Sequence, residues 1–169
     1  GYKTGQSPIE TEYTKFAENL MLESQNTNFE MIIPKDVIVS EKFSIDSPYR
    51  TTSIDNIDDN EMILDIGPQS SILFSEKINQ SKTLLWNGPM GVFEFQQYSS
   101  GTKNIAEKLS QLKTATTIVG GGSTAEITRA LNLHQNMTHV STGGGATLEF
   151  LGGKILPGIS KLNQKDKET

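Results

Sequence analysis

The sequence TTIVGGGSTA, residues Thr116 to Ala125, is the segment around which we expect this chain to fold. A β-branched apolar run ends there at three consecutive glycines and passes into residues that favour the start of a helix. Glycine lets a second molecule approach the main chain closely, because no Cβ stands in the way. The following helix directs its unpaired N–H groups at that molecule, an arrangement typical of an anion site, most often for phosphate.

The same pattern returns in THVSTGGGATLEF, Thr138 to Phe150, where Gly143, Gly144 and Gly145 separate a short β run from an apolar helical pattern. Parallel strands joined by helices end at one edge of their sheet, and ligands bind outside that edge. We therefore expect the two triple-glycine turns to lie side by side there, as the working face of the protein.

Length and composition limit the class of protein. The 169 residues suit one domain, and 34% hydrophobic with 21% charged residues can form a core. The net charge is −5 without a basic stripe, so no nucleic acid partner is expected. No run reaches the roughly 18 apolar residues that span a membrane, and no signal peptide is visible, so no membrane partner is expected either. The absence of cysteine excludes disulfides and thiolate metal sites.

The order of elements predicts a three-layer α/β fold, a Rossmann-like parallel sheet with helices on both faces. Strands are expected over residues 30–34, 62–66, 83–86, 116–119 and 139–141, and helices after residues 7, 67, 100, 121 and 143. Ser7 should cap the first helix, which should cover a sheet face, whereas residues 40–61 should be a solvated connection and the tail after Gly158 should fray. Since the chain opens on a helix, we expect it to be a fragment that lacks its first strand or strands.

Two features of the sequence leave alternatives open. Asp65 interrupts an apolar run, and we interpret it as a hydrogen-bonded structural carboxylate before a catalytic one, since buried charges need partners. The turn NGPMGVFE, residues 87–94, carries Met90, Val92 and Phe93 on what should be an exposed loop. These side chains could lie against a purine or ribose, or they could pack beneath the loop.

Two familiar phosphate-binding patterns fit the glycine turns poorly. A P-loop needs GxxxxGK followed by Ser or Thr, and the nearest match, GGKI at residues 152–155, lacks both the first glycine and the hydroxyl residue. A dinucleotide fingerprint is nominally matched by Gly120, Gly122 and Ala125. It also requires an acidic residue about twenty positions later, where HVST stands at residues 139–142. The hydride-transfer interpretation is weaker for that reason.

A third pattern is a whole set of motifs. WNGPMGVFE (86–94), GT (101–102), GGGSTA (120–125), HVSTGGGATLEFLGGK (139–154) and LPGI (156–159) occur in the order and spacing seen in phosphoglycerate kinases, and DIGP (65–68) and GYKTGQS (1–7) agree. The chain resembles this family over essentially its entire length. The resemblance implies that residues 1–169 are a partial C-terminal nucleotide-binding domain of a two-domain kinase, without the N-terminal phosphoglycerate-binding domain.

The implied activity is reversible phosphoryl transfer between 1,3-bisphosphoglycerate and Mg-ADP, giving 3-phosphoglycerate and Mg-ATP. ATP or ADP and Mg²⁺ would be the cofactors, and the partners would be the nucleotide, the phosphoglycerate substrate and the protein's own N-terminal domain. The resemblance also implies a cytoplasmic monomer, whose 169-residue part binds nucleotide but is inactive alone. A nucleotide-binding module without catalysis, or a diverged copy, is the first alternative, and a dinucleotide-binding oxidoreductase is the second.

The resemblance assigns nucleoside contacts to four residues. Leu64 would line the adenine pocket, and Pro89 and Val92 would pack against the nucleoside. Glu94 would accept hydrogen bonds from the ribose hydroxyls.

Phosphate contacts are assigned mainly to the glycine turns. Asn87 would lie near the phosphates, and Gly121, Gly122 and Thr124 would cradle them. Gly122, Gly144 and Gly145 would act catalytically by placing N–H groups against the transferring phosphoryl group, because phosphoryl transfer depends on positioning and charge stabilisation.

Ser123 departs from the family's pattern, in which GGGD precedes Thr or Ser and the aspartate holds Mg²⁺. A serine can cap the helix, bind the nucleotide and offer a hydroxyl to magnesium, but it brings no negative charge. We therefore expect weaker Mg-nucleotide binding than an aspartate at this position would give.

Overall fold

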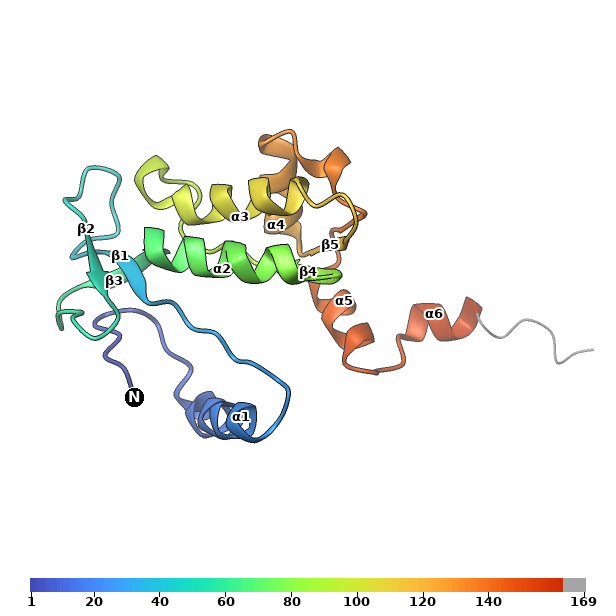
Figure 1. Cartoon of the computed structure of the whole chain (residues 1–169), viewed down its shortest axis with the longest axis horizontal. Helices are drawn as coiled ribbons and strands as arrows, with labels where there is room; N and C mark the ends of the chain where they lie inside the picture. Colours follow the sequence, from blue (N-terminus) through green and yellow to red (C-terminus); the bar gives the residue numbers. More distant parts are fainter. Residues whose placement is uncertain (163–169) are drawn as a thin grey trace, which may run out of the picture. The chain divides into compact units, whose positions relative to one another are not determined.

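The computed structural model describes residues 1–162, and the chain forms two compact units. Unit 1 consists of Gly1–Ser75 and Met90–Thr102, and unit 2 of Glu76–Pro89 and the residues from Lys103 onward. Each unit has its own three-stranded sheet, and Figure 1 labels the strands β1–β3 of unit 1 and β4 and β5 of unit 2. No helix among the described residues is both long and apolar enough to cross a membrane.

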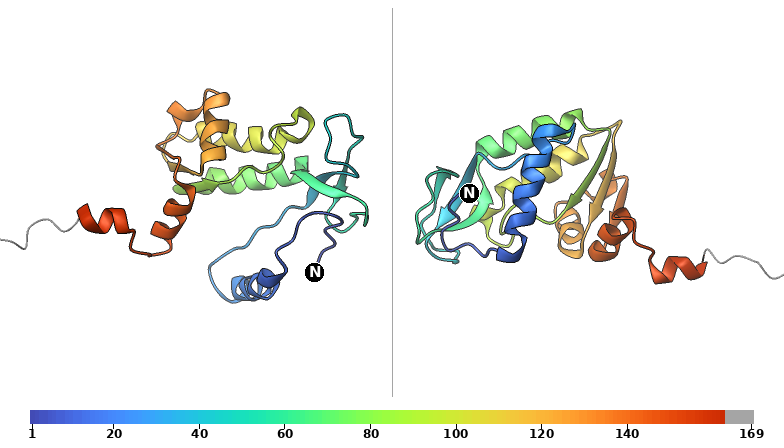
Figure 2. Two further views of the ribbon diagram at one scale, coloured as in Figure 1. Left: turned by 180° about the vertical axis from the view of Figure 1, so that it is seen from behind. Right: turned by 90° about the horizontal axis from the view of Figure 1, so that it is seen from below.

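Unit 2 contains the predicted parallel sheet, with strand order β4-β5-β6 (Figure 2, right panel, olive to orange). The strands are β4 (Thr83–Asn87), β5 (Thr116–Gly120) and β6 (His139–Ser141), and helices α4 (Gly122–Ala130) and α5 (Gly144–Leu151) follow β5 and β6. All five elements lie within a residue or so of their predicted positions. The α/β class and the parallel sheet with its helices are confirmed.

Helix α3 (Ser100–Ser110) leads into β5 and supplies side chains to the core of unit 2. Its Ile105, Ala106 and Leu109 are buried, as is Val119 in β5. The β-branched run of β5 therefore forms the centre of the sheet, where strands are covered on both sides. This buried strand fixes the position of the glycine turn that follows it.

Unit 1 differs from the prediction, because its sheet is antiparallel with the order β2-β1-β3. The strands are β1 (Asp36–Ser40), β2 (Arg50–Ser53) and β3 (Met62–Ile66). The strand expected over residues 30–34 is wrong: β1 begins after Pro34, which has no N–H to donate to a ladder. Residues 62–66 do form a strand, but not in the parallel sheet. The single large sheet of the prediction is replaced by two small ones.

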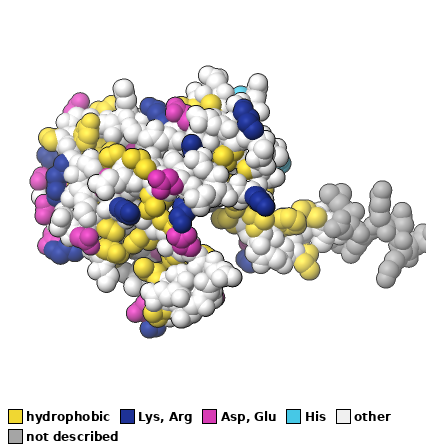
Figure 3. Space-filling view, viewed as in Figure 1, with side chains coloured by type: hydrophobic (Ala, Val, Ile, Leu, Met, Phe, Trp, Pro, Cys, Tyr) yellow, Lys and Arg dark blue, Asp and Glu magenta, His cyan; other side chains and the backbone are white. Residues whose placement is uncertain are grey.

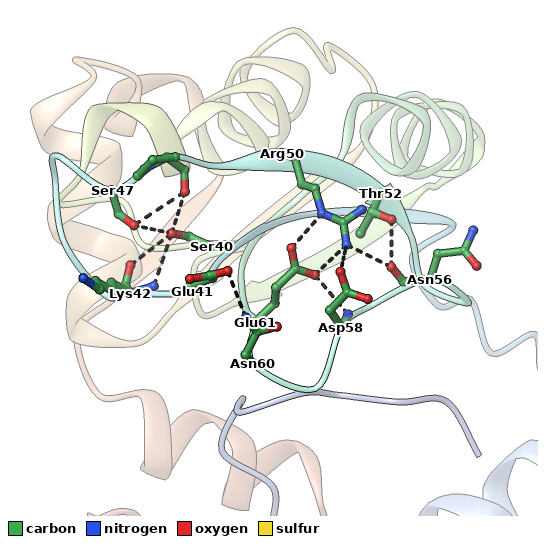
Figure 4. Close-up of polar contacts among 11 residues, drawn as sticks. Ser40, Glu41, Lys42, Ser47, Arg50, Thr52, Asn56, Asp58, Asn60 and Glu61 are labelled. Atoms are coloured by element: carbon green, nitrogen blue, oxygen red, sulfur yellow. Dashed lines mark hydrogen bonds and ion pairs between the residues drawn. The ribbon is translucent and has the colours of Figure 1, made fainter.

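Polar contacts order the segment that was expected to be a solvated connection (Figure 4). Arg50 donates from Nε to Glu61 Oε1 at 2.7 Å and from Nη2 to Glu61 Oε2 at 2.7 Å, and Nη2 also lies 2.9 Å from Asp58 Oδ2. The hydrogen bond from Arg50 holds the pKa of Glu61 below its usual value, although burial opposes this. This ion pair joins β2 to the residue before β3.

The N-terminal helix also differs from the prediction. After a short 3₁₀ turn, η1 (Thr11–Tyr13), helix α1 (Thr14–Asn26) has no buried residue and stands apart from β1–β3 in Figure 1 and in the left panel of Figure 2. Ser7 does not cap it, since its Oγ accepts the N–H of Ile63 at 2.9 Å. A long-range bond to β3 therefore replaces the local cap, and α1 covers no sheet face.

The end of the described chain is helical where the sequence predicted fraying. Helix α6 (Pro157–Leu162) includes Gly158, and the rest of the predicted tail lies outside the described residues. Apolar side chains reach the surface along α5 and α6 (Figure 3), among them Phe150, Leu151 and Ile155.

Asp36 caps helix α2 (Pro68–Gln80) from the neighbouring strand β1. Its carboxylate accepts the N–H of Ser70 at 2.7 Å, the N–H of Gln69 at 3.0 Å and the hydroxyl of Ser70 at 2.7 Å. Burial raises the pKa of Asp36, but the donors of Ser70 and Gln69 outweigh it, and the net pKa lies below the usual value. The charged carboxylate therefore stabilises the folded state.

Replacing Asp36 tests whether its charged carboxylate stabilises the folded state. At about pH 7 we expect Asp36→Asn to lower the free energy of unfolding by about 1–3 kcal/mol, because asparagine keeps only one acceptor oxygen. The folded pKa lies below the unfolded value of 3.8. The negative charge of Asp36 therefore stabilises the folded state above pH 3.8. This stabilisation is lost as the pH falls through the folded pKa. Urea unfolding at several pH values should show the wild-type advantage shrinking in acid, and an advantage independent of pH would contradict the assignment.

Candidate functional site

The two triple-glycine turns lie at one edge of the sheet in unit 2, as the sequence predicts. The register pairs Asn87 with Gly120 and Gly120 with Ser141, so the ends of β4, β5 and β6 form one row. The N–H of Gly121 donates to the carbonyl of Ser141 at 3.1 Å, which joins the two turns directly. The main chains of the two turns are thus neighbours.

Their separation leaves no room for a side chain. A Cβ added at Gly144 would lie 2.7 Å from the Cα and 3.2 Å from the nitrogen of Gly121. Gly121 itself has a φ of +100°, in the region that favours glycine. The close approach therefore requires glycine at residue 144, and the main-chain conformation favours glycine at residue 121.

Helices α4 and α5 begin at these turns with their N-termini uncapped by side chains. The first N–H groups of a helix have no acceptor within the helix, and the helix dipole adds partial positive charge there. Gly122, Ser123 and Gly145 in these first turns are exposed. Two helix N-termini whose first residues are this close can bind the oxygens of an anion with main-chain donors.

Two polar residues frame the glycine turns. The Oδ1 of Asn87 lies 3.2 Å from the position of a Cβ at Gly120 and 3.5 Å from one at Gly144, so its amide lies against both turns. Thr124 is fully buried, and its Oγ1 accepts the N–H of Gly88 at 2.8 Å. Its side chain thus holds the loop after β4 against α4, a role that sequence reasoning missed because nothing in the local pattern indicates the pairing.

The residues assigned to the nucleoside divide between the units, with Pro89 exposed in unit 2. In unit 1 the N–H of Val92 donates to the carbonyl of Leu64 at 2.8 Å. Leu64 is buried with Ile38 and Tyr98, and the half-buried Val92 packs against this cluster. Val92 therefore packs beneath its loop, one of the two alternatives for this turn, whereas Glu94 is exposed. The structure brings Leu64 and Val92 together, and their contacts with a nucleoside stay predictions.

Asp65 is a hydrogen-bonded structural carboxylate in unit 1, the first of its two interpretations. Its side chain is buried and accepts the N–H groups of Gly101 and Ile66, each at 2.8 Å. Burial raises the pKa of Asp65 to about 6, against the lowering effect of these main-chain donors. The carboxylate therefore lies at the N-terminus of α3, where its charge is favoured by the helix and disfavoured by burial.

Thr102 is a second residue that sequence reasoning missed. It is fully buried, and its Oγ1 accepts the N–H groups of Met90 at 3.0 Å and Gly91 at 3.2 Å. The GT pair at the start of α3 was a signal that could have indicated it.

The donors available to a metal ion are few. Among residues 1–162 no group of three or more His, Cys, Asp or Glu side chains could hold one. Ser123 lies exposed in the first turn of α4 and offers one neutral oxygen. Because Mg²⁺ takes six oxygen ligands and favours carboxylate and phosphate, the residues of this turn do not make a magnesium site by themselves.

The close approach of the two turns leads to a paired test. We expect Gly144→Ala to lower the free energy of unfolding by about 1–3 kcal/mol, because its methyl group would collide with the main chain of Gly121. Gly145→Ala is the matched control, since a Cβ there meets nothing within 4 Å and alanine suits a helix better by about 0.5–1 kcal/mol. Urea unfolding measures both, and equal effects of the two substitutions would contradict the close packing.

Comparison of the sequence with known proteins gives consistent matches. The sequence profile of phosphoglycerate kinase matches residues 1–154. The phosphoglycerate kinase of Clostridioides difficile strain 630 is 42% identical over 165 residues, covering 98% of this chain and 41% of that protein. The phosphoglycerate kinase of Chlorobium luteolum is 44% identical over 165 residues, covering 96% of this chain and 42% of that protein.

Solved structures agree with these relatives. The phosphoglycerate kinase of Coxiella burnetii superposes with a TM-score of 0.88 and 39% identity, over 95% of this chain and 41% of that chain. The phosphoglycerate kinase of Pyrococcus horikoshii superposes with a TM-score of 0.77 and 26% identity, over 90% of this chain and 36% of that chain. The chain spans about two fifths of the length of the curated relatives it matches. On the match over residues 1–154 and on these relatives, the chain belongs to the phosphoglycerate kinase family.

Proposed function

We propose that this chain is the nucleotide-binding part of a phosphoglycerate kinase and that the two glycine turns of unit 2 bind the phosphates of ATP or ADP. The observation that supports this best is the approach of Gly144 to Gly121 at two uncapped helix N-termini. Main-chain donors held this rigidly are suited to the negative charge on phosphate oxygens. Family membership supplies the reaction, a reversible transfer of a phosphoryl group with the carboxyl group of 3-phosphoglycerate as acceptor.

Within unit 2 the proposed roles follow the geometry. The N–H groups of Gly122, Gly144 and Gly145 lie in the first turns of α4 and α5 and would contact the transferring phosphoryl group. The N–H of Gly121 already donates to Ser141, so its contribution is to let the turns approach. Thr124 would contribute through its main-chain N–H, because its side chain is fully buried against Gly88. Asn87 would lie beside the phosphates, and Pro89 would pack against the nucleoside.

Within unit 1 we assign Leu64, Val92 and Glu94 to nucleoside binding. The exposed carboxylate of Glu94 is available to ribose hydroxyls. Val92 and Leu64 would contribute apolar side chains, and a hydrogen bond already joins the main chains of these two residues.

Other parts of the proposal rest on the family alone. A further domain would bind phosphoglycerate, since the chain spans only 41% of the Clostridioides difficile enzyme. We therefore expect these residues by themselves to bind nucleotide without turnover. Mg²⁺ would arrive on the nucleotide's own oxygens, where it neutralises phosphate charge. The proposed setting is a cytoplasmic monomer.

Ligand protection distinguishes this function from its alternatives. We expect ADP at about 100 times its Kd to raise the free energy of unfolding by about 2.7 kcal/mol, because only the folded protein offers the site. NAD should give no comparable protection. Thermal unfolding with each ligand measures the effect. Protection by NAD alone would favour the oxidoreductase alternative, and protection by neither would contradict nucleotide binding.

Ser123 gives a test of metal dependence. We expect Ser123→Asp to bind Mg-ADP about tenfold more tightly than the wild type, because a carboxylate adds a charged ligand beside the phosphates. In the presence of a chelator the same substitution should weaken ADP binding, because the new charge then repels the phosphates. Calorimetric titrations with and without Mg²⁺ measure both effects, and equal affinities of the two proteins for Mg-ADP would contradict the expectation.

A further inference from the structure

The segment Met90–Glu94 in unit 1 is held by main-chain hydrogen bonds. The N–H of Val92 donates to the carbonyl of Leu64 in β3. The N–H groups of Met90 and Gly91 donate to the hydroxyl of Thr102 in α3. The segment is therefore fixed on one side to a strand and on the other to the first turn of a helix.

Asp65 lies between these two supports. It follows Leu64 in β3, and its Oδ2 accepts the N–H of Gly101, the residue before Thr102. A Cβ added at either Gly91 or Gly101 would collide with the Asp65 carboxylate. The carboxylate therefore fills the space between the segment and α3, and its side chain is only 1% exposed.

We propose that Asp65 is a positioning residue for nucleoside binding, because it fixes the first turn of α3 and the Met90–Glu94 segment that carries Val92 and Glu94. This inference rests on the proposed function, since the nucleoside roles of Val92 and Glu94 come from it. Asp65 is buried and acts through these neighbours rather than on the nucleotide itself.

Both oxygens of the carboxylate are needed. Oδ2 accepts the N–H of Gly101 and so ties β3 to α3, while Oδ1 accepts the N–H of Ile66, the next residue of β3, and so fixes the orientation of the carboxylate. An asparagine of the same shape offers one acceptor, and its NH₂ group would face one of these N–H donors. A buried donor left unpaired costs free energy, so we expect the first turn of α3 to shift until that donor finds another acceptor.

The variant Asp65→Asn tests the proposal, and Asp36→Asn is its matched control. Asp36 is also a buried carboxylate in unit 1 that accepts N–H groups at the start of a helix, but it contacts α2 instead of the Met90–Glu94 segment. The probes are ADP and inorganic tripolyphosphate, which shares the phosphates but has no nucleoside. Calorimetry gives the Kd of each probe for each protein.

We expect Asp65→Asn to weaken ADP binding about tenfold and to leave tripolyphosphate binding within about twofold of the wild type. Asp36→Asn should leave both affinities unchanged. Unchanged ADP affinity in Asp65→Asn would overturn the proposal, as would an equal loss for both probes or a loss of ADP binding in Asp36→Asn. Wild-type protein that binds neither probe would instead overturn the proposed function.

A second variant decides the matter if Asp65→Asn does not fold. Gly91→Ala disturbs the same contact from the segment, because its methyl group would push against the Asp65 carboxylate, although the substitution removes no hydrogen-bonding group. The same selective loss of ADP binding is expected, and wild-type affinity for ADP in Gly91→Ala would overturn the proposal.

Discussion

The close approach of Gly144 to Gly121 is the constraint on which the candidate site depends. The parallel register of β5 and β6 brings the two turns together, and the absence of a Cβ at Gly144 lets its main chain meet that of Gly121. Each turn opens a helix, so the meeting of the turns is also a meeting of two positive helix ends. The anion binding that we propose at this edge rests on main-chain donors and needs no basic side chain.

Unit 1 uses the same physical element, a helix N-terminus, for a structural purpose. Asp36 and Asp65 are both buried carboxylates that accept N–H groups where α2 and α3 begin. Their pKa values move in opposite directions, since three donors outweigh burial at Asp36, while burial outweighs the donors at Asp65. Stability from Asp36 is therefore lost in acid, and the cost of charging Asp65 appears as the pH rises from 3.8 through about 6.

The parts that the sequence predicted correctly carry strong local signals. The strands and helices of unit 2 were found because β-branched runs ending in glycine mark strand ends wherever they occur. Unit 1 was predicted poorly because long-range contacts order it. The pairing of Arg50 with Glu61 makes a polar segment part of a sheet, and Ser7 accepts from Ile63 instead of capping a helix. In the site, the glycines were predictable from pattern, whereas the hydroxyl acceptors Thr102 and Thr124 depend on partners distant in sequence.

We infer that main-chain N–H groups at the two glycine turns bind phosphate. Titration of ¹⁵N-labelled protein with tripolyphosphate, followed through amide NMR shifts, tests this inference because each N–H reports on its own surroundings. The largest saturable shifts are expected at Gly122, Ser123, Gly144 and Gly145. Saturable binding whose largest shifts lie outside these turns would contradict it.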